Sequence, residues 1–131
     1  MRPKFTLCAI GLLVIVVAQS PSQQPSASVN FSRDVQPILS ANCTGCHVGA
    51  SPAAGLRLDS AAGVLQGSSS GKIVVPGNST QSALAQRVSD TSGNQMPPGG
   101  SLPQAQIALI AAWIDQGAKA DAGEASPRVL T

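Results

Sequence analysis

The sequence has few of the side chains that usually fill a small hydrophobic core. Only three of its 131 residues are aromatic, namely Phe5, Phe31 and Trp113, and tyrosine is absent. Aromatic side chains bury the most area per residue, and small chains bury a low fraction of their surface. The shortage therefore predicts either partial disorder or a core that is completed by something other than amino acids.

Charge is scarce as well. Charged residues make up 11% of the chain, and the formal net charge is +2. Arg2 and Lys4 account for this excess, because six basic and six acidic residues remain from Gln19 onward. Nucleic-acid binding needs a basic surface to neutralise phosphates, so this balance predicts no nucleic-acid partner. The length predicts one domain.

The long apolar run lies at the N-terminus. Arg2 and Lys4 precede fourteen residues, Phe5 to Ala18, that carry no charge. This layout is typical of a signal peptide over residues 1–18, and the run is shorter than the ~20 residues needed to cross a bilayer. We expect export to the periplasm or another compartment outside the cytoplasm, with no membrane span after cleavage. The alternative is an uncleaved N-terminal segment that tethers the protein to the membrane.

The remaining chain divides by composition. Residues 19–30 are rich in Pro, Ser and Gln and predict a flexible leader, and residues 118–131 predict a flexible tail. The predicted domain is therefore 31–117. Its apolar spacing predicts an all-α fold of short helices and long loops, with too little β pattern for a sheet.

Capping residues predict where the first two helices begin. Asp34 is expected to cap a helix that places Pro37 in its first turn, where the missing N–H costs nothing. Ser60 is expected to cap a second short helix that ends at Gly67.

Two further helices follow. Asn78 or Ser79 is expected to cap a helix that carries Leu84, Arg87 and Val88. The last helix has Pro103 near its start, Gly117 at its end and Trp113 beside its apolar stripe. The stripe consists of Ile107, Ile110, Ala111 and Ile114.

The chemistry is concentrated in Cys43-Thr44-Gly45-Cys46-His47. C-x-x-C-H is the attachment signature of a c-type haem. Two cysteines three positions apart lie on one side of a helical turn, so both sulfurs can form thioethers with the vinyl groups of one porphyrin. The adjacent His47 can then bind the iron through an imidazole nitrogen.

Three alternatives to haem attachment fit this motif less well. A thioredoxin-like dithiol would sit in a βα pattern, which the sequence does not show. A zinc site would lack a fourth Cys or His ligand once Cys8 is removed with the signal peptide. A disulfide between Cys43 and Cys46 would close a very small loop and stabilise little.

The second axial ligand is predicted by elimination. Haem iron takes His, Met, Cys or Tyr, and Met96 is the one such residue left in the mature chain. Pro97 follows Met96 and favours an extended backbone, and Pro98 stiffens the segment further. The alternative is a surface Met96, with the iron five-coordinate or bound by Lys or water.

The order of these motifs resembles a class I cytochrome c, and more narrowly the planctomycete-type single-haem cytochrome c domain. The matching stretches are FSRDVQPILSANCTGCH (31–47), GLRLD (55–59), VPGNSTQSALAQRV (75–88) and MPPGGSLPQAQIALIAAWIDQGA (96–118). The resemblance implies one covalent haem c held by Cys43, Cys46, His47 and Met96. One departure is Pro103, where the family often has a Thr or Ser cap.

The resemblance also implies two structural details. The first and last helices should cross, with Ile38 and Leu39 near Ile110, Trp113 and Ile114. The carbonyl of Pro76 should accept the second imidazole N–H of His47, and such bonds fix ring orientation.

With both axial positions filled, the sequence predicts an outer-sphere electron carrier rather than an enzyme, with a redox partner protein that the sequence does not identify. The alternatives are a haem peroxidase or ligand sensor in which Met96 dissociates, and a non-haem dithiol module. Arg57 or Arg87 could pair with haem propionates, although a solvated Arg is the simpler interpretation of each. Trp113 is expected in the core.

Overall fold

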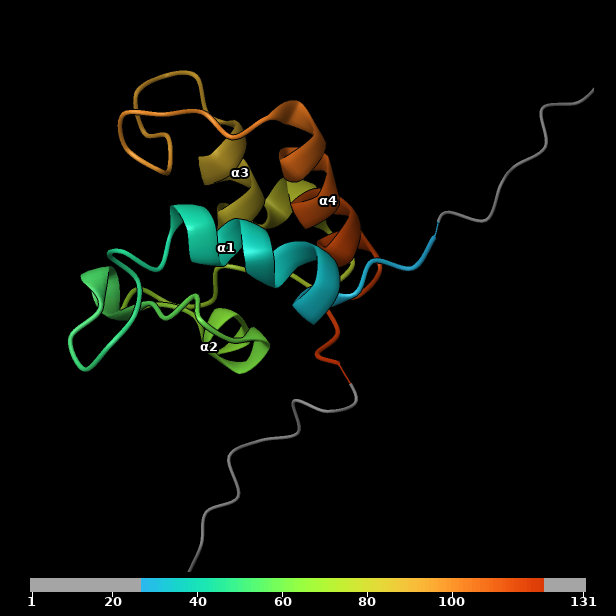
Figure 1. Ribbon diagram of the computed structural model, residues 1–131, viewed down its shortest axis with the longest axis horizontal. Coiled ribbons are helices and arrows are strands. Elements are labelled where there is room, and N and C mark those ends of the chain that lie inside the picture. Colours follow the sequence, from blue (N-terminus) through green and yellow to red (C-terminus); the bar gives the residue numbers. More distant parts are fainter. Residues whose placement is uncertain (1–26, 122–131) are drawn as a thin grey trace, which may run out of the picture.

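The computed structural model describes residues 27–121, so the predicted signal peptide and most of the predicted leader and tail lie outside the described residues. The described part contains four α-helices: α1 (Gln36–Asn42), α2 (Ala61–Gln66), α3 (Ala83–Ser89) and α4 (Gln104–Asp115). Long loops separate them, and the described residues form no strand beyond a single bridge between Ser68 and Gly71. The predicted all-α class is confirmed (Figure 1).

The first helix begins earlier than the sequence predicted. A π-helical segment, η1 (Phe31–Val35), leads directly into α1, and its N-cap is Asn30 rather than Asp34. The Asn30 side chain accepts the Arg33 N–H at 2.8 Å, while the Asn30 N–H donates to Asp34 Oδ2 at 2.8 Å. Asp34 thus completes a reciprocal cap from inside the helix. Pro37 is the second residue of α1 and so lies in the first turn of that helix, as predicted, directly after a wide turn in which the Gln36 N–H bonds to the Phe31 carbonyl.

The predicted cap of α2 is confirmed. Ser60 Oγ accepts the Gly63 N–H at 3.1 Å, and Gly67 ends the helix with a φ of 88°. This backbone conformation is one that glycine adopts readily. A Cβ at Gly67 would also lie only 2.5 Å from the Gly71 carbonyl oxygen.

The third predicted helix is split in two. Asn78 caps a short 3₁₀ turn, η3 (Ser79–Gln81), and α3 begins as a separate helix after Ser82. The buried Ser82 hydroxyl donates to the Asn78 carbonyl at 2.8 Å and accepts the Val75 N–H at 2.8 Å. These local bonds compete with a continuous helix and account for the break.

Helix α4 forms as predicted, with Pro103 before its first turn and Gly117 (φ 104°) after its last. Ile110, Trp113 and Ile114 are buried. The helix packs against η1, α3 and η3, and at η1 the Trp113 ring lies 5.0 Å from the Phe31 ring with an interplanar angle of 50°. The crossing with the first helix therefore lies at η1, earlier than the predicted position at Ile38 and Leu39.

The core is aliphatic apart from this aromatic pair. It gathers side chains from all four α-helices and from the loops between them. Its buried members are Phe31, Val35, Ile38, Leu39, Leu58, Ala61, Val64, Val74, Leu84, Ala85, Val88, Leu102, Ile110, Trp113, Ile114 and Ala118.

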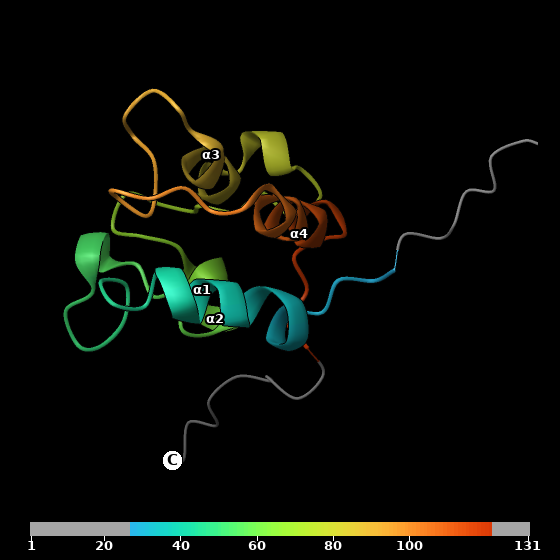
Figure 2. The same ribbon diagram turned by 45° about the horizontal axis from the view of Figure 1, so that its top comes forward.

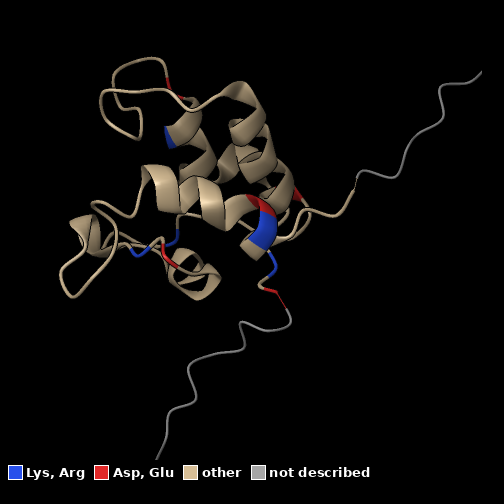
Figure 3. Ribbon diagram, in the orientation of Figure 1, with Lys and Arg blue, Asp and Glu red and all other residues tan. Residues whose placement is uncertain are grey.

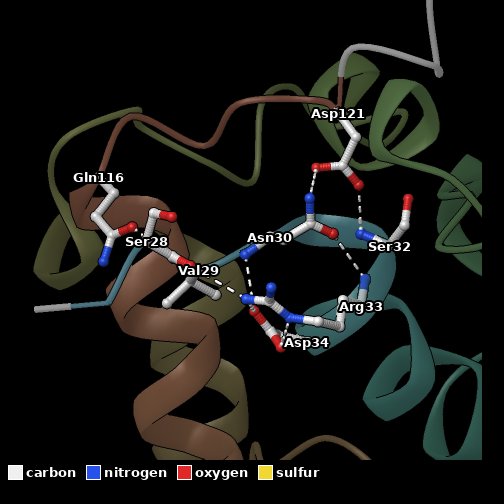
Figure 4. A network of polar contacts seen from close by, with 8 residues as sticks. All are labelled: Ser28, Val29, Asn30, Ser32, Arg33, Asp34, Gln116 and Asp121. Atoms are coloured by element: carbon white, nitrogen blue, oxygen red, sulfur yellow. Dashed lines mark hydrogen bonds and ion pairs between the residues drawn. The ribbon is translucent and has the colours of Figure 1, made fainter.

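The two ends of the described chain are joined by polar contacts (Figure 4). Asp121 Oδ1 accepts the Asn30 side-chain amide at 2.6 Å, and Asp121 Oδ2 accepts the Ser32 N–H at 2.7 Å. Trp113 Nε1–H donates to the Lys119 carbonyl at 2.9 Å, and Ala118 is buried. Residues 118–121, which the sequence assigned to a flexible tail, are therefore packed against the domain.

Candidate haem-attachment site

The C-x-x-C-H segment forms a tight turn at the end of α1. The Cys43 N–H continues the helix by bonding to the Leu39 carbonyl at 2.8 Å. The Cys43 carbonyl then accepts the N–H groups of Cys46 at 3.1 Å and His47 at 3.0 Å. The structure therefore brings the three predicted residues together in one turn, and the helix fixes where that turn begins.

Both thiols in this turn are free. Cys46 is exposed, whereas Cys43 is half-buried beside the core. Burial raises the pKa of the Cys43 thiol, because removing water disfavours the charged thiolate. The turn thus offers two free thiols in different environments, one at the surface and one against apolar side chains.

His47 is held by a carbonyl that the sequence did not identify. His47 Nδ1 lies 3.1 Å from the Ala53 carbonyl oxygen, so the predicted partner, Pro76, is wrong. Two main-chain hydrogen bonds also hold the segment after His47 against the C-x-x-C-H turn. The Ala53 N–H donates to the Cys46 carbonyl at 2.9 Å, and the Leu58 N–H donates to the His47 carbonyl at 2.9 Å. A proton on Nδ1 that is shared with Ala53 leaves Nε2 as the acceptor nitrogen, which is available to a metal.

The Ala53 carbonyl belongs to a short 3₁₀ turn, η2 (Ala53–Gly55). Ala54 in this turn has a φ of 55°, a left-handed conformation that costs a non-glycine residue free energy. Its carbonyl is held by Ser69, which donates both its N–H and its hydroxyl at 2.9 Å. No sequence signal marked this turn, because its partners lie fifteen residues apart and meet only in the folded chain.

Met96 lies in the loop between α3 and α4. Its side chain is 40% exposed, and its N–H donates to the Arg87 carbonyl at 2.9 Å. The Met96–Pro97 peptide bond is cis. In both ribbon views this loop and the loop that follows α1 lie on the same side of the molecule, away from the two chain ends (Figures 1 and 2).

The two arginines considered for haem propionates have protein partners. Arg57 forms an ion pair with Asp59, with Nη2 and Oδ2 2.5 Å apart. Arg87 Nη1 donates to the Asn94 carbonyl at 3.0 Å. Trp113 lies in the core, as predicted.

Two cavities lie away from the cysteines and His47. One, of about 260 Å³, lies between η3, α3 and α4. The other, of about 200 Å³, lies beneath the loop that carries Met96 and is bounded by residues of that loop, α3 and α4. Among residues 27–121 no group of three or more His, Cys, Asp or Glu side chains is placed to hold a metal ion.

A helical fold with C-x-x-C-H at the end of α1, an imidazole oriented through Nδ1 and a Met-Pro loop before α4 is the arrangement expected of a c-type cytochrome domain. Residues 43–100 match the family model described as planctomycete cytochrome c, which confirms the predicted resemblance. The match begins at Cys43 and extends past Met96, so it contains the complete candidate site. Cytochromes of this type carry covalently bound haem c.

A solved structure supports the same fold. The chain resembles part of hydrazine synthase from Kuenenia stuttgartiensis, with a TM-score of 0.50 and 25% sequence identity. The similarity covers 71% of this chain but only 16% of that one. No curated protein matches the sequence. The predicted cytochrome c fold is confirmed, while the enzymatic activity of the much larger neighbour belongs to that protein.

Proposed function

We propose that this chain is a single-haem electron carrier that works outside the cytoplasm, with His47 and Met96 as the axial ligands of the iron. The observation that carries the proposal is the turn at Cys43–His47, in which two free thiols and a ring oriented through Nδ1 occur together. This set of donors fits a covalently attached haem.

The two cysteines supply the attachment. Each thiol adds its S–H across a vinyl double bond, so that a carbon–sulfur bond forms, the hydrogen passes to the other vinyl carbon and no oxidant is consumed. The main-chain bond from the Cys46 N–H to the Cys43 carbonyl joins the two cysteines in one turn. The raised pKa of Cys43 keeps its hydrogen in place at neutral pH.

His47 supplies the first axial nitrogen. Its bond to the Ala53 carbonyl favours the tautomer with the proton on Nδ1, which leaves Nε2 as the nitrogen that would bind a metal. The Ala53 carbonyl also accepts the Leu56 N–H at 3.1 Å, and Ser69 holds the neighbouring Ala54 carbonyl. The ring therefore needs little rearrangement when it binds a metal, and little when the metal changes its oxidation state.

Met96 supplies the second ligand. A thioether raises the reduction potential relative to a second imidazole. When bound, haem supplies the ferrous–ferric couple. If His47 and Met96 both held the iron, no ligand position would be left for a substrate, which favours outer-sphere electron transfer over catalysis.

The distribution of charged residues indicates how a redox partner protein would be recognised. Basic and acidic residues are scattered over the described surface (Figure 3), and two of the basic side chains pair with acidic neighbours, Arg33 with Asp34 and Arg57 with Asp59. Scattered and paired charges create little long-range field. We therefore propose a redox partner that docks through shape and apolar contact, as small electron-transfer interfaces do.

A ligand-binding haem protein is the second candidate. The exposure of Met96 favours it, because a weakly buried thioether is easier to displace. This candidate would bind a small ligand to the ferrous iron at a rate that Met96 does not limit. The two candidates therefore differ in how much the rate of ligand binding to the ferrous iron depends on Met96.

The test compares wild type with Met96→Ala, each made with a cytochrome maturation system. Leu109→Ala is the matched control, because Leu109 is a similarly exposed apolar side chain on α4. We expect covalent haem in all three proteins on a denaturing gel. We expect loss of the red-region Met-to-iron absorption band and rapid carbon monoxide binding in Met96→Ala alone.

Two results would contradict the proposal. Absence of covalent haem from the wild type refutes haem binding itself. Equal carbon monoxide rates in wild type and Met96→Ala refute Met96 ligation and favour the ligand-binding candidate.

Export is tested separately by the mass of the purified protein and by cell fractionation. We expect loss of residues 1–18 and recovery in the soluble exported fraction. An intact N-terminus in the membrane fraction would instead indicate a tether. Within residues 27–121 no helix is both long and apolar enough to cross a membrane.

A further inference from the structure

The loop that carries Met96 is fastened to the end of α3 at two points. The main-chain carbonyl of Arg87 accepts the Met96 N–H at 2.9 Å. The Arg87 guanidinium donates to the Asn94 carbonyl at 3.0 Å. One residue therefore contacts the loop backbone on both sides of Gln95.

Two further hydrogen bonds connect the start and the end of the segment that contains Met96. The Gln95 side-chain amide donates to the Gly100 carbonyl at 2.7 Å and to Ser101 Oγ at 2.8 Å. Met96 lies inside the ring that these bonds close. The position of the ring relative to α3 depends on the two Arg87 contacts and on Asp90, directly after α3, whose carboxylate accepts hydrogen bonds from Ser92 and from the Asn94 N–H.

Packing supplies little of the restraint. Residues 91–94 are exposed, and the cavity of about 200 Å³ beneath the loop is lined by Val88, Asp90, Gln95, Leu102 and Ile107, among others. A segment that lies over a cavity is not fixed by close contacts with the core. Hydrogen bonds to α3 must therefore hold it.

We propose that the Arg87 guanidinium is a positioning residue for Met96, holding the loop at the distance from α3 that lets the thioether reach its metal. This inference rests on the proposed role of Met96 as a ligand. The main-chain bond from Met96 to Arg87 survives any substitution at Arg87, so the guanidinium bond to Asn94 is the part that a variant can remove. Its loss frees the segment before Met96 and raises the fraction of time that the thioether is displaced.

The experiment compares Arg87→Ala with Gln86→Ala in the haem-loaded protein. Gln86 is the matched control, because it is exposed, adjacent on α3, and donates its side-chain amide to a main-chain carbonyl, that of Thr80, at 2.8 Å. Arg87→Lys is included as the conservative variant, since it keeps the charge and one donor. Melting temperatures of all variants check that they fold.

Loss of one net hydrogen bond predicts a rise of roughly fivefold in the carbon monoxide binding rate of ferrous Arg87→Ala. We expect its Met-to-iron band to disappear at a lower temperature, and the Met96 amide to exchange with solvent faster. Arg87→Lys should recover part of each effect, and Gln86→Ala should match wild type in all three. The amide measurement does not depend on the iron, so it reports on the loop directly.

The proposal is overturned if Arg87→Ala behaves like Gln86→Ala while wild type shows the band. If wild type holds haem without the band, Met96 is not the ligand, and both the proposed ligation and the positioning role are wrong. If all three α3 variants change together, the effect belongs to the helix and not to the guanidinium, which also overturns the proposal.

Discussion

The contact between Phe31 and Trp113 gives the sharpest prediction about stability. Phe31 is fully buried, and its ring meets Trp113 where the first and last helices cross. Replacing a buried Phe by Ala costs about 3–5 kcal/mol, which includes the cavity that is left behind. This is a large part of the ~5–15 kcal/mol that stabilises a domain. We therefore expect Phe31→Ala to be among the most damaging single substitutions in the described chain.

The size of the effect can be followed by urea unfolding of the haem-loaded protein. At a slope of about 2 kcal/mol per M, a loss of about 4 kcal/mol lowers the midpoint by about 2 M. Phe31→Leu keeps apolar bulk and is expected to lose about 1–2 kcal/mol, part of it from the aromatic pair. Val75→Ala, at a side chain that is 41% exposed, should cost less than about 0.5 kcal/mol.

A double-mutant cycle isolates the ring contact. Phe31→Leu and Trp113→Leu, alone and together, should show a coupling free energy of about 0.5–1.5 kcal/mol. A midpoint for Phe31→Ala no lower than that of Val75→Ala would refute the reasoning. So would additive effects of the two Leu substitutions, because the rings would then contribute nothing beyond their separate burial.

Two more predictions concern the haem and acid. Replacing Cys43 and Cys46 together by Ser should give a haem-free protein that melts without a cooperative transition by circular dichroism, because the core has few aromatic side chains; a native-like melt would contradict this. Arg33, and then the Asn30 N–H, lower the pKa of Asp34 to about 2. An unfolded Asp titrates near 3.9, so the stability that this carboxylate contributes is complete above about pH 5 and is lost as the pH falls toward 2. Urea midpoints measured between pH 2 and 5 should show a shallower loss in Asp34→Asn; an unchanged profile would refute the assignment.

The features that could be predicted from the sequence depend on neighbours along the chain. The stripe of α4, its end at Gly117 and the Ser60 cap are all local patterns, and each is confirmed. The C-x-x-C-H turn also needs only one helical turn to bring its residues together. Local sequence determines these features because every interacting partner lies within a few residues.

The features that could not be predicted depend on partners that the sequence does not single out. Asn30 displaces Asp34 as the cap, and its side chain is held by Asp121, 91 residues away. The His47 partner is Ala53 rather than Pro76, because any carbonyl can accept the bond and side-chain identity does not reveal which one is near. A main-chain acceptor such as the Ala53 carbonyl leaves no signal in the sequence, and the contact between Asn30 and Asp121 forms only in the folded chain.

The bond between Asn30 and Asp121 has a consequence for how the domain can be mounted. It holds the two ends of the described chain together, on the side of the molecule opposite the loops that follow α1 and α3 (Figures 1 and 2). The described part of the chain therefore begins and ends on one side, and neither of its ends crosses the loops that follow α1 and α3. A partner that docked against those two loops would not meet either end of the described chain.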